Sequence, residues 1–404
     1  MNIFVVNSGS SSIKYQFFKM PDEKPICTGL VERIGLEDSM ITHKLFLKGE
    51  EKMIQRRLDI PDHESGLKQV AEILTDSEIG VIHNPQEIDA VGHRVVHGGE
   101  TFASTTIITP EVKSEIKKLF SLAPLHNPAN YLGIDVAEKI FTKAKQVAVF
   151  DTAFHQTIPE EAYRYAIPHS FYKELGIRVY GFHGTSHKYV SEKASEYLQN
   201  PLAKLVTIHL GNGCSMTAVN AGKSIDTSMG FGPLNGLVMG TRSGDVDPFI
   251  IFHLVNQLGY SLDQVNNILN KQSGMLGLTG FSDMRDVTRA IAEGNEDAEL
   301  AYTIYAYRIK KYIGMYAAVL NGLDAIMFTG GVGENDINIR RMACNNMDFI
   351  GIQIDEEKNK IRSNDIREIN SENAAVKVLI VPTNEELEIV KQCFELLQEE
   401  VPVV

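Results

Sequence analysis

Apolar positions along the chain follow two periods, one typical of buried strands and one typical of helices. Continuous or alternating apolar runs predict strands at residues 3–6, 13–18, 146–150, 324–329 and 377–382. Apolar positions three and four residues apart predict helices at residues 111–120, 130–141, 248–270, 287–321 and 385–399. Because strands and helices alternate over most of the length, the pattern indicates an α/β protein with a largely parallel sheet.

Two segments share one order of elements, which indicates an internal duplication. Residues 4–18 read as a strand, a small polar turn with a glycine, and a second, alternating strand. Residues 205–219 repeat this order, and a third strand is expected after each hairpin, within residues 21–31 and 220–227. Hairpins are common, so coincidence is the competing explanation. The order of predicted strands and helices starts again near residue 151, where we expect the boundary between two domains.

Composition and charge exclude several classes of function. The 404 residues are 43% hydrophobic and 23% charged, as in an ordinary globular protein. The formal net charge of −13 argues against general binding to nucleic acid or to an anionic membrane. We expect no membrane span and no secretory leader, because the sequence lacks the apolar runs that both require. The four cysteines fit no zinc spacing and are predicted to be reduced, packed thiols of a cytoplasmic protein.

Three glycine-containing turns follow predicted strands and are candidates for phosphate binding. The first, at residues 7–12, lacks the GK[ST] of a Walker A loop and precedes a strand. Its N–H groups and hydroxyls could form an anion nest within reach of Lys14, or it could be a plain hairpin turn. The turn at residues 209–213 repeats the arrangement. The third, at residues 330–334, would let a flat ligand approach the backbone, or would simply join a strand to a helix.

Cationic and acidic residues lie between these turns, beside glycine or proline or at strand ends. They are Arg94, His126, Asp151, His183 and Arg242. A zinc site at His183 and His187 is disfavoured, because GFHGTSH lacks the glutamate of HExxH. Each histidine alone is more often structural, but the whole set suits phosphoryl transfer, whose transition state carries charge on three oxygens. Asn7, Asp151 and Glu385 are oxygen donors of the kind that Mg²⁺ binds.

The motifs that carry these residues resemble those of acetate kinases, one after another along the chain. They read NSGSSSIKY, GHRVVHGGE, APLHNP, VAVFDTAFHQTIP, YGFHGTSH, HLGNG, DTSMGFGPLNGLVMGTRSGDVDP, FTGGVGEN and PTNEE. The resemblance implies a duplicated ribonuclease-H-like (actin-like ATPase) fold, with two domains flanking a nucleotide cleft. The domains would be residues 1–151, with a helix at 386–404 packing back on them, and residues 152–385. It also implies a homodimer and the reaction acetate + ATP ⇌ acetyl phosphate + ADP.

The resemblance further implies roles for individual residues. Asn7 and Glu385 would hold Mg²⁺, or Mn²⁺ in its place. His183 and Arg242 would stabilise the transferring phosphoryl group, and Asp151 would be the essential acidic residue. Arg94 would bind the carboxylate substrate beside the remaining substrate contacts, which are Val96, Leu125, His126, Phe182 and Pro233. The expected nucleotide contacts are Lys14, His209, Leu210, Gly211, Asn212, Gly213, Asp283, Met284, Arg285, Gly330, Gly331, Val332, Gly333 and Glu334.

Simple acid chemistry refines the expected mechanism. A carboxylic acid with a pKa of about 4.3 is already ionised at pH 7, so acetate needs no general base. We therefore expect Asp151 to order metal-bound water and a cationic neighbour rather than to remove a proton. The closest alternative is a kinase for propionate or another short acid. A non-catalytic actin-like nucleotide-binding protein is a more distant one, disfavoured because ATP binding alone does not need Arg94, His183 and Arg242 together.

Overall fold

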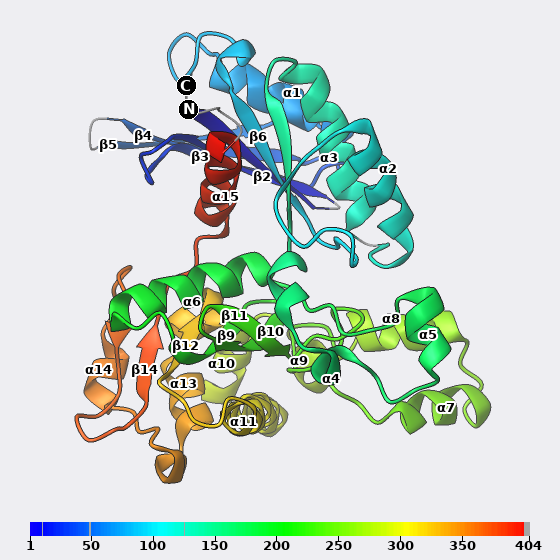
Figure 1. Ribbon diagram of the computed structural model, residues 1–404, viewed down its shortest axis with the longest axis vertical. Coiled ribbons are helices and arrows are strands. Elements are labelled where there is room, and N and C mark those ends of the chain that lie inside the picture. Colours follow the sequence, from blue (N-terminus) through cyan, green and yellow to red (C-terminus); the bar gives the residue numbers. More distant parts are fainter. Residues whose placement is uncertain (10, 48–49, 125, 400–404) are drawn as a thin grey trace. The chain divides into compact units, whose positions relative to one another are not determined.

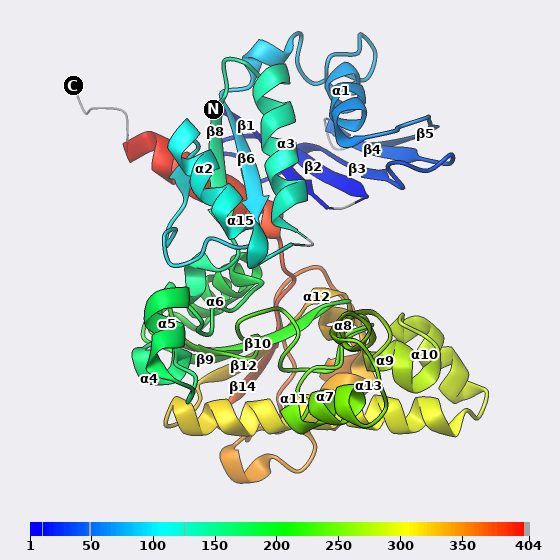
Figure 2. The same ribbon diagram turned by 90° about the vertical axis from the view of Figure 1, so that its right-hand side faces the viewer.

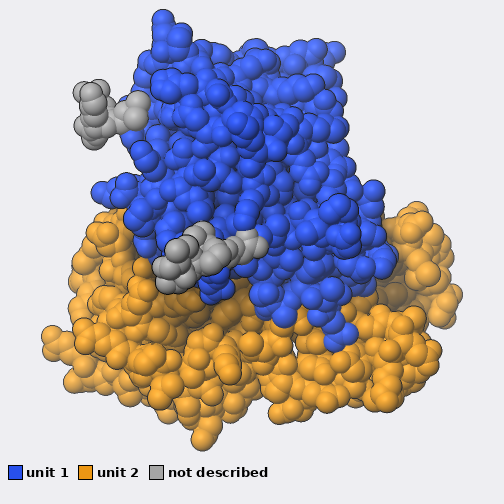
Figure 3. All heavy atoms as spheres, turned by 45° about the horizontal axis from the view of Figure 1, so that its top comes forward, with its two compact units in different colours: residues 1–153, 384–404 blue, residues 154–383 orange. Residues whose placement is uncertain are grey.

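The computed structural model describes residues 1–9, 11–47, 50–124 and 126–399, and the chain divides into two compact units (Figure 3). Unit 1 comprises Met1–Ala153 and Asn384–Val404, and unit 2 comprises Phe154–Thr383. The first boundary stands after residue 153 rather than after 151. The second stands before residue 384 rather than before 386, so Glu385 belongs to unit 1.

Unit 1 is built on one sheet with the strand order β5-β4-β3-β2-β1-β6-β8-β7 (Figures 1 and 2). Its strands are β1 (Asn2–Ser8), β2 (Ser12–Lys19), β3 (Pro25–Glu32), β4 (Met40–Leu47), β5 (Glu50–Arg57), β6 (Ala90–Val95), β7 (Thr106–Ile107) and β8 (Lys145–Phe150). Its helices are α1 (His63–Leu74), α2 (Pro110–Lys118), α3 (Asn127–Ile140) and α15 (Glu385–Glu399). Strands β1, β6 and β8 are parallel, whereas β1 to β5 are joined as antiparallel neighbours.

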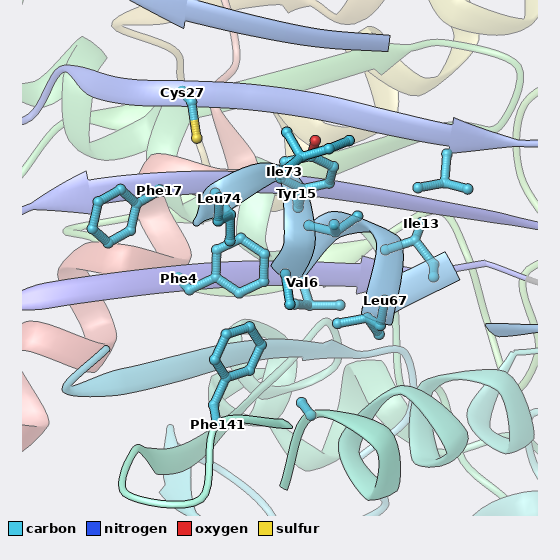
Figure 4. Packing of buried hydrophobic residues seen from close by; sticks show 14 of the residues in the cluster. Phe4, Val6, Ile13, Tyr15, Phe17, Cys27, Leu67, Ile73, Leu74 and Phe141 are labelled. Atoms are coloured by element: carbon cyan, nitrogen blue, oxygen red, sulfur yellow. The ribbon is translucent and has the colours of Figure 1, made fainter. Parts of the chain in front are cut away.

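Both faces of this sheet are covered, which explains the nearly continuous apolar run in β1. On one face, Phe4 and Tyr15 pack with residues of α1 and α3, including Leu67 (Figure 4). The tyrosine keeps its hydroxyl paired, 2.8 Å from Nδ1 of the buried His43. On the other face α15 lies so close to β6 that a Cβ atom at Gly92 would come within 2.9 Å of the Cys393 sulfur.

Unit 2 has a second sheet, with the order β11-β10-β9-β12-β14-β13. Its strands are β9 (Lys204–Leu210), β10 (Cys214–Asn220), β11 (Lys223–Thr227), β12 (Ala325–Thr329), β13 (Arg367–Glu368) and β14 (Lys377–Ile380). Its helices are α4 (Glu160–Tyr163), α5 (His169–Leu175), α6 (Gly184–Leu198), α7 (Pro248–Asn256), α8 (Leu262–Lys271), α9 (Gly274–Thr279), α10 (Met284–Ala292), α11 (Glu296–Val319), α12 (Gly330–Asn335), α13 (Ile337–Cys344) and α14 (Glu356–Lys360). Residues of α6 pack on one face of this sheet, around Val190 and Leu205.

The two sheets repeat one topology, so the expected duplication is confirmed. In unit 1 the order β3-β2-β1-β6-β8 combines two antiparallel pairs with two parallel ones. In unit 2 the order β11-β10-β9-β12-β14 has the same pattern of directions. Each unit thus starts with an antiparallel three-stranded meander and continues with parallel strands reached through helices, as ribonuclease-H-like domains do.

Three predicted elements differ from the structure. The helix expected at residues 248–270 is interrupted between α7 and α8, where Gly259 has a φ of +73°. The helix expected at 287–321 breaks between α10 and α11 at Gly294, which has a φ of +86°. The third glycine turn is already helical, because residues 330–335 form α12.

None of the helices in the described part of the chain combines the length and the apolar character needed to cross a membrane. The four cysteines are all buried and free, as the sequence predicted. Burial raises the pKa of Cys27 and of Cys344 to about 12, so both thiols stay protonated at neutral pH.

Candidate active site

The carboxyl ends of three parallel strands in unit 1 bring predicted site residues to one edge of the sheet. Asn7 lies near the end of β1 and is paired across the ladder with Lys14 of β2. Arg94 lies near the end of β6, the strand beside β1. Asp151 directly follows β8, and its N–H donates to the carbonyl of Val95 at 3.0 Å. Open α/β sheets place ligands at this edge, so the topology alone gathers polar side chains here.

Arg94 and Asp151 form a bidentate ion pair. The Nε atom of Arg94 donates to Oδ1 and Oδ2 of Asp151 at 3.1 and 3.0 Å, and Nη2 also donates to Oδ2. Glu385, in the first turn of α15, lies 3.9 Å from Nε of Arg94. Burial disfavours the charged arginine, but the carboxylates of Asp151 and Glu385 outweigh it and raise the pKa of Arg94. The pair fixes the plane of the guanidinium group.

A second ion pair joins Lys14 to the buried Glu386, with 2.6 Å between Nζ and Oε1. Burial raises the pKa of the neighbouring Glu385, against the opposing charge of Arg94. The carboxylates of Asp151, Glu385 and Glu386 thus outnumber the cations of Arg94 and Lys14, and Asn7 is the strand partner of Lys14. One or two carboxylate or amide oxygens are what Mg²⁺ takes from a protein when it also binds substrate phosphates. Asn7 and Glu385 fit that set, although the described residues contain no cluster of three or more His, Cys, Asp or Glu with metal-site geometry.

Two asparagines at the start of α3 hold the loops around this edge, and the sequence analysis missed both. Asn130 is buried; it donates to the carbonyl of Ser8 at 2.8 Å and accepts from the N–H of Val96 at 3.1 Å. Asn127 clamps the backbone of His97 by two hydrogen bonds of 3.0 Å. The end of β1 and the segment after β6 are therefore tied to one helix. An asparagine early in a helix is a weak signal, because it serves equally well as a cap.

In unit 2, His183 has a backbone conformation that side chains seldom adopt. It stands before the first residue of α6 with φ +57° and ψ +25°. Its Nδ1 atom lies 2.9 Å from the hydroxyl of Ser215 on β10. Its ring lies against that of His209, at the end of β9, with 4.6 Å between the ring centroids. Left-handed backbone in a non-glycine residue needs support from its surroundings and is often found at functional sites.

The turn between β9 and β10 brings His183 and Arg242 together. A Cβ atom added to Gly213 would come within 2.8 Å of Nη2 of Arg242 and 3.2 Å of Cε1 of His183. Both side chains thus lie over this glycine, and a larger residue would push them away. Arg242 also donates from Nη1 to the carbonyl of Pro233 at 2.5 Å. Burial lowers the pKa of Arg242, because it holds the charge of the guanidinium group partly out of water.

A cavity of about 930 Å³ within unit 2 is lined in part by the first two residues of the same turn, Gly211 and Asn212. Its lining includes seven predicted nucleotide contacts: Gly211, Asn212, Asp283, Met284, Arg285, Gly331 and Val332. It also includes residues that the sequence analysis missed: Ser282, Thr288, Asn335, Asp336, Ile337, Asn338 and Arg362. A site of this size is in the range of small-molecule and cofactor pockets. Apart from Asn335, which ends the motif FTGGVGEN, the missed residues carry no short motif among those recognised in the sequence, so the fold is what shows that they line the cavity.

Local chemistry shapes the segments that carry the lining residues of this cavity. Gly330 has a φ of +76°, and a Cβ there would approach the carbonyl of Leu210 to 2.8 Å, so only glycine fits. The carboxylate of Glu334 accepts from the N–H of Gly330 at 3.0 Å and from that of Thr383 at 3.2 Å. Asp283 caps α10 by accepting from the N–H of Arg285 at 2.8 Å.

The remaining predicted residues fall in both units. Val96 is buried and its N–H donates to Asn130 of α3, whereas His126 is exposed at the start of that helix. Phe182 is buried and Pro233 half-buried, both in unit 2. Leu125 lies outside the described residues. Lys14 belongs to unit 1, and the other expected nucleotide contacts belong to unit 2.

Two ribonuclease-H-like units in one chain define the actin-like ATPase fold. The structure of the acetate kinase of Porphyromonas gingivalis matches with a TM-score of 0.91 at 44% identity, over 98% of this chain and 99% of that one. The structure of a propionate kinase from Francisella tularensis matches with a TM-score of 0.90 at 42% identity, over 97% and 98% of the two chains.

The sequence comparisons cover the same length. The acetate kinase of Flavobacterium johnsoniae is 61% identical over 398 residues, which is 98% of this chain and 100% of that protein. The model of the acetokinase family matches residues 2–391. The chain belongs to the acetokinase family.

Proposed function

We propose that this protein is an acetate kinase, which transfers the terminal phosphoryl group of ATP directly to acetate and releases acetyl phosphate and ADP, reversibly. The observation that carries the proposal is the turn at residues 211–213. Its first two residues line the cavity of about 930 Å³, and its last residue lies under His183 and Arg242. A nucleotide held in that cavity with its phosphates at the turn would present them to two cationic side chains.

Arg94 is the proposed partner of the acetate carboxylate. A planar guanidinium group recognises a carboxylate through a fork of two N–H donors. Asp151 binds the Nε and Nη2 atoms of Arg94 and so sets the direction of that fork. Acetate is ionised at neutral pH and attacks without losing a proton, so the role of Asp151 in this proposal is orientation, not base catalysis.

His183 and Arg242 are the proposed stabilisers of the transferring phosphoryl group. The transition state is loose and spreads negative charge over three oxygens, and fixed positive groups lower its energy most. Asn7 and Glu385 are the proposed holders of Mg²⁺, with Mn²⁺ as a substitute. When bound, the metal neutralises charge on the nucleotide phosphates. Residues of α12 and the start of α10 would contact the adenosine part of ATP or ADP.

A hydroxylamine trap tests the proposed function. The protein is incubated with ATP, Mg²⁺ and either acetate or propionate, and the acyl phosphate is captured as a coloured hydroxamate. We expect a strong signal with acetate and a weaker one with propionate. A stronger signal with propionate would favour the short-chain carboxylate kinase that the structure from F. tularensis exemplifies by name. No signal with either acid would leave a non-catalytic nucleotide-binding protein.

The preference between the two acids is expected to depend on Val96. One methylene group in a small apolar pocket changes the binding free energy by about 1–3 kcal/mol, so propionate is disfavoured but not excluded. Val96→Ala should raise the ratio of kcat/KM for propionate to that for acetate by about tenfold. Val112→Ala, a similar truncation at a partly buried residue of α2, is the matched control. An unchanged ratio in the Val96 variant would remove Val96 from the acyl pocket.

The same proposal includes a homodimer in the cytoplasm. Free cysteines are usual in reducing compartments. Helix α7 reads PFIIFHLVN and has no buried residue, and 72% of Phe249 and 57% of Phe252 are exposed. An apolar helix left bare in this way is typical of an interface between subunits.

The double variant Phe249→Glu/Phe252→Glu is therefore expected to sediment as a monomer at micromolar concentration, whereas the unchanged protein sediments as a dimer. Charged residues in the core of an apolar interface leave buried charges without partners. Leu36→Glu, at an exposed leucine of unit 1, is the control and should stay dimeric. Dimers of the double variant as tight as those of the unchanged protein would place the interface elsewhere.

A further inference from the structure

A chain of buried polar side chains runs from the sheet of unit 2 to His183. The hydroxyl of Ser215 lies 2.9 Å from Nδ1 of His183 and 2.7 Å from Nε2 of His187. The other ring nitrogen of His187, Nδ1, lies 2.6 Å from the hydroxyl of Thr207. That hydroxyl also lies 3.4 Å from the carbonyl of Thr217 on the neighbouring strand. Ser215, His187 and Thr207 are all fully buried.

The carbonyl at the end of the chain favours one direction for the hydrogen bonds in it. A carbonyl only accepts, so the single hydroxyl proton of Thr207 points to Thr217. Thr207 can then only accept from His187, whose proton must be on Nδ1. A neutral His187 consequently offers the lone pair of Nε2, and Ser215 donates to it. Ser215 in turn accepts a hydrogen bond, and its partner is Nδ1 of His183.

This order requires that His187 is neutral, and its surroundings support that state. Burial lowers the pKa of His187 well below its usual value, and His155 and His209 add to the effect. The ring of His155 lies 5.7 Å from that of His187, centroid to centroid. A positively charged His187 would be buried away from water and would lie among other histidines. Both conditions disfavour the charged form.

We propose that Ser215 and His187 are positioning residues that keep a proton on Nδ1 of His183, so that His183 can donate from Nε2 to the transferring phosphoryl group only as an imidazolium cation. This inference rests on the proposed function. A neutral histidine carries one ring proton, and here that proton is committed to Ser215. Donation from the opposite nitrogen then needs a second proton. The enzyme thus obtains a full positive charge at the phosphoryl group instead of a neutral donor.

The charged and titratable groups around His183 in unit 2 come from several elements. His209 of β9 lies against its ring, Arg242 reaches the same glycine, and His187 of α6 is linked through Ser215. Arg242 disfavours a second positive charge at His183, whereas a phosphoryl group between them favours it. Protonation of His183 and binding of a phosphoryl group are therefore coupled. Activity is expected to be present at low pH and lost as the pH rises and His183 becomes neutral.

The opposite direction of the chain would have a different consequence. If Thr207 donated to Nδ1 of His187, the proton of a neutral His187 would be on Nε2 and would be donated to Ser215. Ser215 would then donate to Nδ1 of His183. A neutral His183 would then carry its proton on Nε2 and could bind a phosphoryl oxygen without further protonation. The two directions therefore differ in the tautomer of His183, which can be measured directly.

The first test is nitrogen-15 NMR of the full-length protein labelled only at histidine, with the His183 signals identified by their loss in His183→Asn. At a pH where His183 is neutral, we expect the Nδ1–H tautomer. In Ser215→Ala the Nε2–H tautomer should become populated. An Nε2–H tautomer in the unchanged protein would overturn the proposal. This measurement needs no substrate, so it remains decisive if the hydroxamate assay fails and the proposed function falls.

The second test is the pH profile of kcat at saturating substrates. In the unchanged protein kcat should fall about tenfold per pH unit on the alkaline side, as expected when one protonated group is required. Ser215→Ala should lower the maximal kcat by about 10- to 100-fold, because the ring is less well placed, and should flatten the alkaline limb. Ser215→Thr keeps the hydroxyl and should restore the limb.

Thr217→Val is the matched control. It removes a buried hydroxyl from the same strand, two residues further along, but leaves the carbonyl that ends the chain. In this variant the tautomer of His183 and the alkaline side of the pH profile of kcat should match those of the unchanged protein. An alkaline limb that persists unaltered in Ser215→Ala would show that Ser215 does not control the protonation of His183 and would overturn the proposal.

Discussion

Alanine in place of Arg242 is expected to lower kcat by about 10³- to 10⁵-fold, the range found for arginines that stabilise a transferring phosphoryl group. Arg242 lies over Gly213 beside His183, and its other nitrogen is held by the carbonyl of Pro233. The KM for ATP should change far less than kcat, because the charge that Arg242 stabilises develops in the transition state. Steady-state kinetics at saturating acetate measures both quantities.

Two further variants separate charge from geometry. Arg242→Lys keeps the positive charge but loses the planar pair of N–H donors that a guanidinium group offers. Its kcat should therefore lie between those of the alanine variant and the unchanged protein. Arg289→Ala removes an exposed ion pair with Asp286 on α10 and is the control for loss of an arginine from unit 2. If Arg242→Ala retained a tenth of the original kcat, the proposed role of Arg242 would be wrong.

The second large effect is expected for Asp151→Asn, in both stability and activity. Asp151 is 1% exposed, and its loss would leave Arg94 beside the more distant carboxylate of Glu385. Removing one partner of a buried ion pair costs about 3 kcal/mol, to be measured as the free energy of unfolding in urea. A misdirected Arg94 should also lower kcat by about 10²-fold. Part of this loss should be recovered at raised Mg²⁺ or Mn²⁺, since the proposed role of Asp151 includes ordering metal-bound water.

The control is Asp135→Asn, which breaks a more exposed pair with Lys113 in the same unit. Its cost should stay below about 1 kcal/mol, as for most surface ion pairs. A limb of the pH–rate profile that belongs to Asp151 and persists at saturating metal would contradict the orienting role. It would indicate proton transfer by this carboxylate instead.

The sequence predicted the duplicated meander well, because its strands alternate or are continuously apolar and their turns contain glycine. It did not predict β4, in which the inward-facing residue between Ile41 and Leu45 is a histidine. The hydroxyl of Tyr15 satisfies His43, a pairing that no local pattern reveals. Helix α6 was missed for a similar reason, since it buries Ser186, His187 and Ser191 on the face where apolar residues would be expected.

The candidate site shows the same contrast between residues that the sequence predicts and residues that it does not. Arg94, Asp151, His183 and Arg242 stand in glycine-rich motifs or at strand ends, and the resemblance to a known family assigned them roles. The residues that position them carry no such signal. Asn130 and Ser215 are ordinary polar residues in a helix and a strand, and their importance follows only from what they contact. The helical character of α12 was also hidden, because three glycines in a row of five indicate a loop.

The return of α15 to unit 1 has a consequence for synthesis on the ribosome. When residues 1–153 have emerged, the face of β6 around Gly92 still lacks the helix that covers it. Arg94 and Asp151 can already meet, but Glu385 is added only after all of unit 2 has been translated. A nascent or prematurely terminated polypeptide therefore cannot complete this cluster, and a stop codon anywhere before α15 should yield an inactive product.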